Sequence, residues 1–234
     1  MFFDWTYVVL VLPCVLLALW ASTNVNSTFQ KYAQVHSIRR ITGADAAQRV
    51  LSANGVSGVR IERVKGNLTD HYDPKANVIR LSDAVYSSTS AAAIGVACHE
   101  AGHAVQYAQH YAPIKLRAAV IPATNIGSKL AMPLILLGLL FSYMGNASYW
   151  LVYAGIACFG FSLVFQLITL PVEFNASRRA MQAIESTDIL TSEEQRCARR
   201  TLTAAALTYV AATAVALMQL LRLILIFGGR RRND

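Results

Sequence analysis

The sequence predicts an α-helical membrane protein with about four transmembrane helices and a small extramembrane domain that mixes helix and strand. Hydrophobic residues make up 55% of the 234 residues and charged residues only 15%, which is more apolar than a typical soluble domain. This composition excludes a disordered chain. Lys and Arg exceed Asp and Glu by 21 to 13. On so apolar a chain this excess indicates a membrane surface, so we expect a lipid bilayer and no nucleic-acid partner.

Three uncharged runs are long enough to cross a bilayer, which needs about 20 helical residues. The run from Leu130 to Val172 is long enough to cross twice, and the residues Gly145 to Ser148 supply a turn in its middle. We therefore expect a hairpin of two helices there and a single span in each of the other runs. The predicted spans are Trp5–Ser22, Leu130–Met144, Tyr149–Leu170 and Thr201–Leu221.

The orientation follows from the basic residues. All but four of the 21 fall within residues 31–129 and 173–200, which four spans place on one side of the membrane. The positive-inside rule makes that side the cytoplasm, although Arg230 to Arg232 then lie outside. The first span begins beside Asp4 and not beside a basic region, so we expect a retained anchor and not a cleaved signal.

These spans divide the chain into five predicted segments. Only one of the polar segments is long enough to form an extramembrane domain. The segments are an N-terminal transmembrane anchor (1–30), the extramembrane part (31–129), a transmembrane hairpin (130–172), a polar helix (173–200), and a C-terminal transmembrane helix with a basic tail (201–234).

The extramembrane part mixes helix and strand patterns. Thr42 followed by Asp45 predicts a short helix that ends near Gly55. From Ala84 the pattern changes to one long Ala-rich helix that reaches about Gln109. Two stretches read as strands, Val59–Val64 and Asn77–Ser82.

The Ala-rich helix contains the sequence His99-Glu100-Ala101-Gly102-His103, which is an H-E-x-x-H pattern. With about 3.6 residues per turn, His99 and His103 lie on one face of the helix and can bind the same cation. Glu100 projects beside them toward a water on that cation. The alternative is two histidines that only contact neighbours or solvent, but the pattern lies on a helix, where a zinc site requires it.

A catalytic zinc usually has three protein ligands and one open position for water. The third ligand must lie on the same side of the membrane as the motif. Glu173 is favoured, because it directly follows the hairpin that returns the chain to that side. Alternatively, Glu173 starts a helix after Pro171 and only interacts with the helix dipole. The other candidates are His110, Glu185, Asp188, Glu193 and Glu194.

Three stretches together resemble the YugP-like neutral zinc metallopeptidases of bacteria, and the resemblance covers nearly the whole chain. They are His99–His103, Leu68–Pro74 and Leu170–Ala180. The layout is more distantly similar to HtpX-type membrane proteases, in which a membrane hairpin also separates the motif from a ligand glutamate. The resemblance implies a gluzincin-like zinc metallopeptidase domain, in which the edge strand of a small sheet receives the substrate. It also implies Zn²⁺ ligands His99, His103 and Glu173, with Glu100 as the base.

The sequence departs from the HtpX-type pattern at one position. Those proteins carry an aspartate four residues after the ligand glutamate, and this sequence has Ser177 there. Either Ser177 orients a ligand histidine more weakly, or Asp70 substitutes. His71, in the strand and turn region, is our candidate donor to the oxyanion that forms during hydrolysis.

Taken together, these features predict a zinc endopeptidase in the bacterial inner membrane, with its active site facing the cytoplasm. It would hydrolyse peptide bonds through a metal-activated water, from which Glu100 takes a proton. Its partner is a polypeptide substrate, which can itself be a membrane protein; the sequence predicts no oligomeric state. The alternative is a non-catalytic zinc-binding scaffold or assembly factor, which has no use for Glu100.

Overall fold

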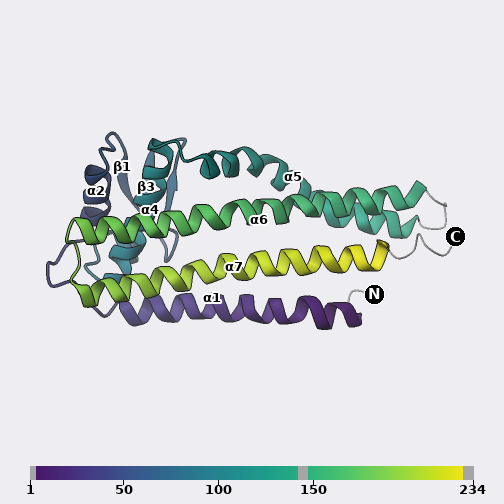
Figure 1. Cartoon of the computed structure of the whole chain (residues 1–234), viewed down its shortest axis with the longest axis horizontal. Helices are drawn as coiled ribbons and strands as arrows, with labels where there is room; N and C mark the ends of the chain where they lie inside the picture. The colour runs from purple at the N-terminus through teal and green to yellow at the C-terminus, as the bar shows by residue number, and fades with distance from the viewer. Residues whose placement is uncertain (1–3, 142–146, 229–234) are drawn as a thin grey trace. The chain divides into compact units, whose positions relative to one another are not determined.

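The computed structural model describes residues 4–141 and 147–228 (Figure 1). Gly145 and Asn146 of the expected turn lie outside these residues, and so do Arg230 to Arg232. The chain forms two compact units. The all-helical unit consists of Met1–Trp20, Leu116–Leu170 and Tyr209–Asp234, and the mixed unit consists of Ala21–Lys115 and Pro171–Thr208. The predicted segment boundaries at residues 30, 129, 172 and 200 stay predictions.

Four helices in the described part of the chain are long and apolar enough to cross a membrane, as the sequence predicts. They begin with α1 (Leu12–Tyr32), which follows a π-helical turn over Tyr7–Val11. The others are α5 (Ala112–Leu140), α6 (Ala147–Ser186) and α7 (Ser192–Gly228). Each of these helices is longer than the span predicted for it, because the polar residues next to that span are also helical.

The polar segment 173–200 does not form a helix of its own, so that prediction is wrong. Helix α6 runs without a break through Pro171 to Ser186, and α7 begins at Ser192. Proline removes one backbone hydrogen bond, which long helices of membrane proteins tolerate. Glu173 therefore projects from the later part of a long helix, and the interpretation of Glu173 as a helix-start residue beside the dipole is also wrong.

In the all-helical unit, glycines allow α5 and α6 to pack closely. A Cβ atom on Gly155 would lie 2.7 Å from the carbonyl oxygen of Ala131, and one on Gly127 would lie 2.9 Å from that of Cys158. Small residues at such contacts are typical of helices that associate in membranes. In the same unit, Arg222 Nε lies 3.2 Å from Asp4 Oδ1, so the buried arginine is paired with a carboxylate.

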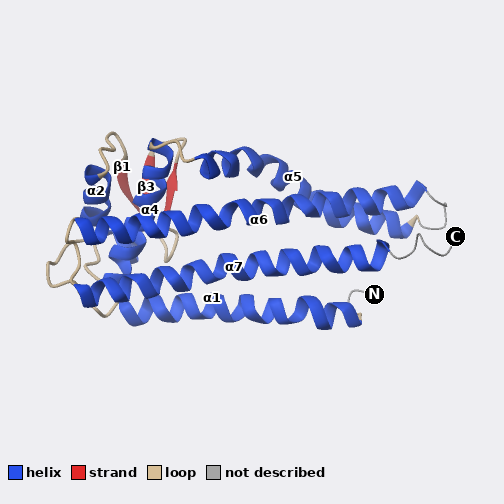
Figure 2. Cartoon of the chain, in the orientation of Figure 1, coloured by secondary structure: helices blue, strands red, loops and turns tan. Residues whose placement is uncertain are grey.

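The mixed unit contains the short helix and the sheet that the sequence predicts. Thr42 caps α2 (Gly43–Ala53) in a capping box with Asp45. The strands are β1 (Arg60–Val64), β2 (His71–Asp73) and β3 (Val78–Ser82), drawn in red in Figure 2. The order is β1-β3-β2, with β1 parallel and β2 antiparallel to β3. Strand β2 is too short to show an alternating pattern, so the sequence indicates a strand and turn region around His71 but not the bounds of the strand.

The expected long helix from Ala84 to Gln109 is in fact two helices, α3 (Asp83–Tyr86) and α4 (Ala91–Ala108). The break falls on a run of Ser and Thr residues that ends at Ser90. Ser90 has an extended backbone, and its side chain accepts a hydrogen bond from the Ala93 amide at 3.2 Å. Serine at such a position satisfies a backbone donor that a helix start leaves unpaired, so the new helix begins there.

Helix α4 lies in the core of the mixed unit, and most of its residues are buried. Its small residues let other helices approach. A Cβ atom on Gly102 would lie 2.8 Å from the carbonyl oxygen of Ala176 on α6, and one on Gly95 would lie 3.2 Å from Cβ of Ala198 on α7. The H-E-x-x-H face of α4 is therefore held directly against the part of α6 that carries Glu173.

Candidate metal centre

One turn of α4 and one turn of α6 bring together the three residues that the sequence predicts as ligands. His99 and His103 lie on one face of α4, with ring centroids 4.7 Å apart. Glu173 Oε2 on α6 lies 3.2 Å from His99 Nε2 and 3.5 Å from His103 Nε2. Within residues 4–141 and 147–228, this is the one group of His, Cys, Asp or Glu side chains that could hold a metal ion.

The spacing and chemistry of these atoms fit zinc. Tetrahedral ligands bonded at about 2.0 to 2.1 Å lie about 3.3 Å from one another, and all three donor atoms here lie within 4.8 Å of one another. Two imidazoles and one carboxylate form a donor set that leaves a fourth position open. The Glu173 side chain is only 3% exposed, and burying a carboxylate there is costly without a cation or strong hydrogen bonds.

The remaining candidates for a third ligand lie in other surroundings. Asp188 forms a hydrogen-bonded ion pair with Arg39. Glu194 accepts hydrogen bonds from the backbone amides of Ile38 and Thr191. Neither of them, nor His110, Glu185 or Glu193, belongs to the metal-capable group.

Ser177 lies where a residue that orients a ligand would be expected. Its hydroxyl oxygen is 3.1 Å from His99 Nδ1, and it follows Glu173 by one turn on α6. Asp70 has a different environment, because its carboxylate accepts hydrogen bonds from the Ser82 amide at 2.7 Å and the Ser82 hydroxyl at 2.9 Å. Of the two residues considered from the sequence, Ser177 is therefore the one beside a ligand histidine.

Glu100 lies on α4 next to the ligand face and is only 9% exposed. Its negative charge affects the pKa of two neighbouring groups. Burial, together with the charge of Glu100, raises the pKa of the Asp70 carboxyl despite the hydrogen bonds from Ser82. Burial would lower the pKa of His103, but its hydrogen bond with Glu173 and the charges of Glu100 and Glu173 raise it. The negative charge that favours a proton on His103 also attracts a divalent cation.

Comparison with known proteins identifies the family of the chain. A family model described as putative neutral zinc metallopeptidase matches residues 7–228. The chain belongs to this metallopeptidase family. A curated relative from Bacillus subtilis (strain 168), named putative membrane protease YugP, is 44% identical over 228 residues, which cover 97% of this chain and 99% of the relative. No solved structure matches the chain. The resemblance stated from the sequence is confirmed.

In this metallopeptidase, Gln106 is a site residue that the sequence did not single out. It is fully buried, and its side-chain oxygen lies 3.0 Å from His103 Nδ1. Its amide nitrogen donates to the Val172 carbonyl at 2.8 Å and to Asn175 Oδ1 at 3.0 Å. The amide oxygen must therefore accept from His103, which puts a proton on Nδ1 and leaves the lone pair of Nε2 for a metal.

Arg179 fixes the direction of these hydrogen bonds. Its Nε donates to Asn175 Oδ1 at 2.7 Å, and a second guanidinium nitrogen donates to the side-chain oxygen of Gln109 at 2.5 Å. Arginine can only donate, so the Asn175 oxygen must face Arg179 and Gln106. The one available signal for Gln106 was its position three residues after His103, which places it on the same helix face.

We expect replacement of Gln106 by methionine to weaken zinc binding by about 10- to 100-fold, the range found when a ligand histidine loses its hydrogen-bond partner. Methionine has a similar volume but cannot accept the proton of His103 Nδ1. Competition with a chromophoric chelator measures the affinity. Gln48→Met, at an exposed position on α2, is the matched control. Equal affinities in the two variants would show that Gln106 does not orient His103.

His71 lies on the edge strand β2, and its side chain is exposed. Its Nδ1 is 2.8 Å from the Thr69 carbonyl oxygen, and its Nε2 is 3.5 Å from an Arg80 guanidinium nitrogen. Its hydrogen-bond partners are thus residues of the sheet region and not of the metal centre. The role of His71 as an oxyanion donor stays a prediction.

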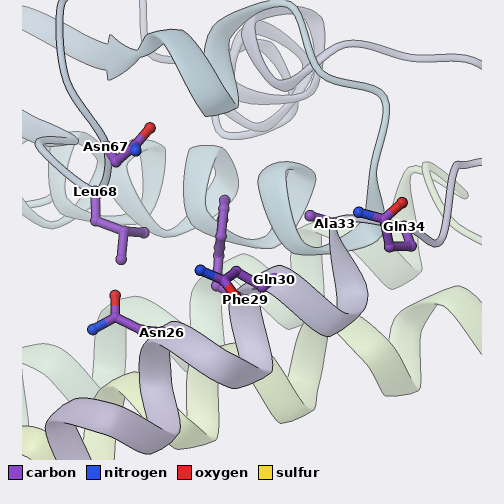
Figure 3. A pocket seen from close by; sticks show the side chains of 7 residues that line it. All are labelled: Asn26, Phe29, Gln30, Ala33, Gln34, Asn67 and Leu68. Carbon is purple, nitrogen blue, oxygen red and sulfur yellow. The ribbon is translucent and has the colours of Figure 1, made fainter.

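Strand β2 contacts the motif helix. The ring of Tyr72 on β2 lies 5.6 Å from that of Tyr107, which follows His103 by four residues on α4. A pocket of about 410 Å³ adjoins the chain that leads into β2, and Figure 3 shows Leu68 and Phe29 projecting into the space between that chain and α1. Its lining residues are Asn26, Phe29, Gln30, Ala33, Gln34, Asn67 and Leu68.

Proposed function

We propose that this metallopeptidase is a zinc-dependent endopeptidase of the bacterial inner membrane, with its active site facing the cytoplasm. One observation carries the proposal: the donor atoms of His99, His103 and Glu173 converge to the spacing of a zinc site, and Glu100 lies beside them on α4. The family and the relative named as a membrane protease support peptide hydrolysis as the reaction.

His99, His103 and Glu173 would hold the ion. Bound zinc supplies a Lewis acid, which lowers the pKa of a coordinated water and polarises the substrate carbonyl. Glu100 takes a proton from the attacking water and delivers it to the leaving amine. Ser177 and Gln106 accept the Nδ1 protons of the two histidines, and so keep both Nε2 atoms available to the ion.

The arrangement of the sheet supports an extended polypeptide as the substrate. Strand β2 forms one edge of the sheet and lies against α4 through Tyr72 and Tyr107. A peptide that pairs with a strand edge gains main-chain hydrogen bonds with little sequence preference, as in the gluzincin-like arrangement. The pocket beside Asn67 and Leu68 would then take a substrate side chain, and its amide groups suit a polar, uncharged one.

A non-catalytic zinc scaffold is the alternative. It would need the three ligands but not Glu100, and burial of an unneeded carboxylate near that of Asp70 costs stability. The position of Glu100 therefore favours the enzyme.

Membrane vesicles of known orientation test the reaction and its side together. We expect inverted inner-membrane vesicles that contain the protein to cleave added casein, because the basic segments that carry the site face outward there. Intact spheroplasts should not cleave it. Treatment with a zinc chelator should abolish the cleavage, and zinc should restore it. Cleavage by spheroplasts alone would reverse the proposed orientation, and zinc binding without cleavage in either preparation would favour the scaffold.

A further inference from the structure

A groove of about 400 Å³ lies between α6 and α7 in the mixed unit, apart from the expected substrate strand. The two helices run alongside each other there (Figure 1). The lining residues are Phe174, Ser177, Arg178, Met181, Gln182, Glu185, Arg199, Leu202, Thr203 and Ala206. Neither the ligands nor Glu100 line it, so it is a separate feature of the same helices.

The groove is apolar at one end and charged at the other. Phe174, which is 46% exposed, follows the end of the uncharged run at Val172 by two residues. On α7, Leu202 and Ala206 lie inside the uncharged run that begins at Thr201. In both helices the groove therefore spans the border between apolar and charged sequence. Such a border lies where the hydrocarbon of a bilayer gives way to the headgroups.

Two arginines line the charged part of the groove and are exposed, Arg178 on α6 and Arg199 on α7. Among the described residues, neither guanidinium has an ion pair. Their neighbours differ, because Arg179 donates to Asn175 and Gln109, and Arg200 donates to the Tyr32 hydroxyl. Two guanidinium groups without an internal partner attract an anion.

One acidic residue also lines the groove. Glu185 lies two turns beyond Arg178 on α6, which is about 10 Å along the helix axis. It is not within ion-pair distance of Arg178 or Arg199, so it leaves the arginine part of the groove positive. Together with Gln182 it offers hydrogen-bond partners to hydroxyl groups rather than to a phosphate.

We propose that this groove binds the headgroup of an anionic phospholipid, with its phosphate between Arg178 and Arg199 and its acyl chain along Phe174 and Ala206. The chemistry is that of basic sites between membrane helices, which bind anionic headgroups. Ser177 lines the groove, and its hydroxyl contacts His99. The lipid thus binds the stretch of α6 that carries Glu173 and Ser177, and stabilises its packing beside α7.

The test uses the full chain in the Glu100→Gln form, so that lipid binding is measured independently of cleavage. After delipidation in detergent, the protein is mixed with phosphatidylglycerol or phosphatidylcholine, and bound lipid is counted by native mass spectrometry. We expect a preference for phosphatidylglycerol. Arg178→Gln/Arg199→Gln should weaken this binding by about 30-fold, because each basic residue near an anionic lipid surface contributes about fivefold.

The matched control, Arg49→Gln/Lys65→Gln, removes the same charge from exposed positions elsewhere in the mixed unit. This control should retain the preference for phosphatidylglycerol. The melting temperatures of the two variants check that both of them fold. Equal losses in the two variants would overturn the proposal, since general charge attraction would explain them. The proposal would also be overturned if inorganic phosphate raised the melting temperature as much as phosphatidylglycerol does. The groove would then be a site for free anions.

A third result would assign the groove to a different occupant. The same arginine and control variants are also made with the native Glu100, so that cleavage can be measured. If the arginine variant retains lipid normally but cleaves a membrane-anchored substrate more slowly than the control, the groove docks substrate and the lipid proposal fails. Failure of the proposed peptidase activity would not affect the lipid measurement, because lipid binding needs neither zinc nor Glu100.

Discussion

Replacement of Glu100 by glutamine should leave zinc bound and reduce peptide cleavage at least about 100-fold, the lower end of the range for loss of a general acid or base. Glutamine keeps the size and shape of the side chain, but it has an amide NH2 donor in place of one carboxylate oxygen and cannot take a proton from water. His99, His103 and Glu173 are unchanged in this variant, so the donor set for the ion is intact.

The measurement pairs zinc content, by elemental analysis of protein in detergent, with cleavage of casein by the same samples. Glu62→Gln is a suitable control, because Glu62 lies on β1 and pairs with Arg60 and Arg80 rather than with the metal centre. We expect wild-type cleavage from that control. Equal cleavage by the Glu100 variant and the wild type, with zinc retained in both, would refute Glu100 as the base.

The sequence predicts those parts of the fold that depend on local pattern. The uncharged runs predict four membrane helices, and the pair Thr42 and Asp45 predicts α2 because a capping box is formed by neighbours in the chain. The strands β1 and β3 begin within one residue of their predicted positions. In each case the residues that determine the element lie inside it or beside it.

Other parts depend on partners that are distant in the chain. Strand β2 has three residues and forms only because it pairs with β3, His71 opposite Arg80. Helix α6 continues through Pro171, where sequence rules favour a helix start, and prolines inside long helices of membrane proteins are tolerated. The side-chain oxygen of Gln106 faces His103 because Val172 and Asn175 hold its amide nitrogen from α6.

The metal centre combines both kinds of information. Helical spacing alone places His99 and His103 on one face. Glu173 requires the hairpin to return the chain to that face, and Gly102 allows the close approach that follows, since a Cβ there would meet the Ala176 carbonyl oxygen at 2.8 Å. The position of the third donor is thus determined by the packing of α4 against α6.

Glu173→Ala should therefore lose bound zinc. It removes one of three donors, leaving two imidazoles, and we expect zinc affinity to fall by more than the roughly 10- to 100-fold cost of losing a ligand's hydrogen-bond partner. Alanine also removes a buried carboxylate, and the two histidines it contacts can stay neutral without it, so the apo variant should still fold. Loss of zinc then reflects the missing ligand and not an unfolded site.

Glu185→Ala is the matched control, because Glu185 lies on the same helix, is exposed, and is outside the metal-capable group. Zinc content after dialysis against a weak chelator should be normal in this control and absent in Glu173→Ala, while both melt at similar temperatures once zinc is removed. If Glu173→Ala keeps its zinc and Glu185→Ala loses it, the third donor is Glu185. That outcome would require α6 to turn relative to α4, because Glu185 follows Glu173 by 12 residues, more than three turns along the helix. The close contact at Gly102 opposes such a rotation, which is why we expect Glu173 to be the ligand.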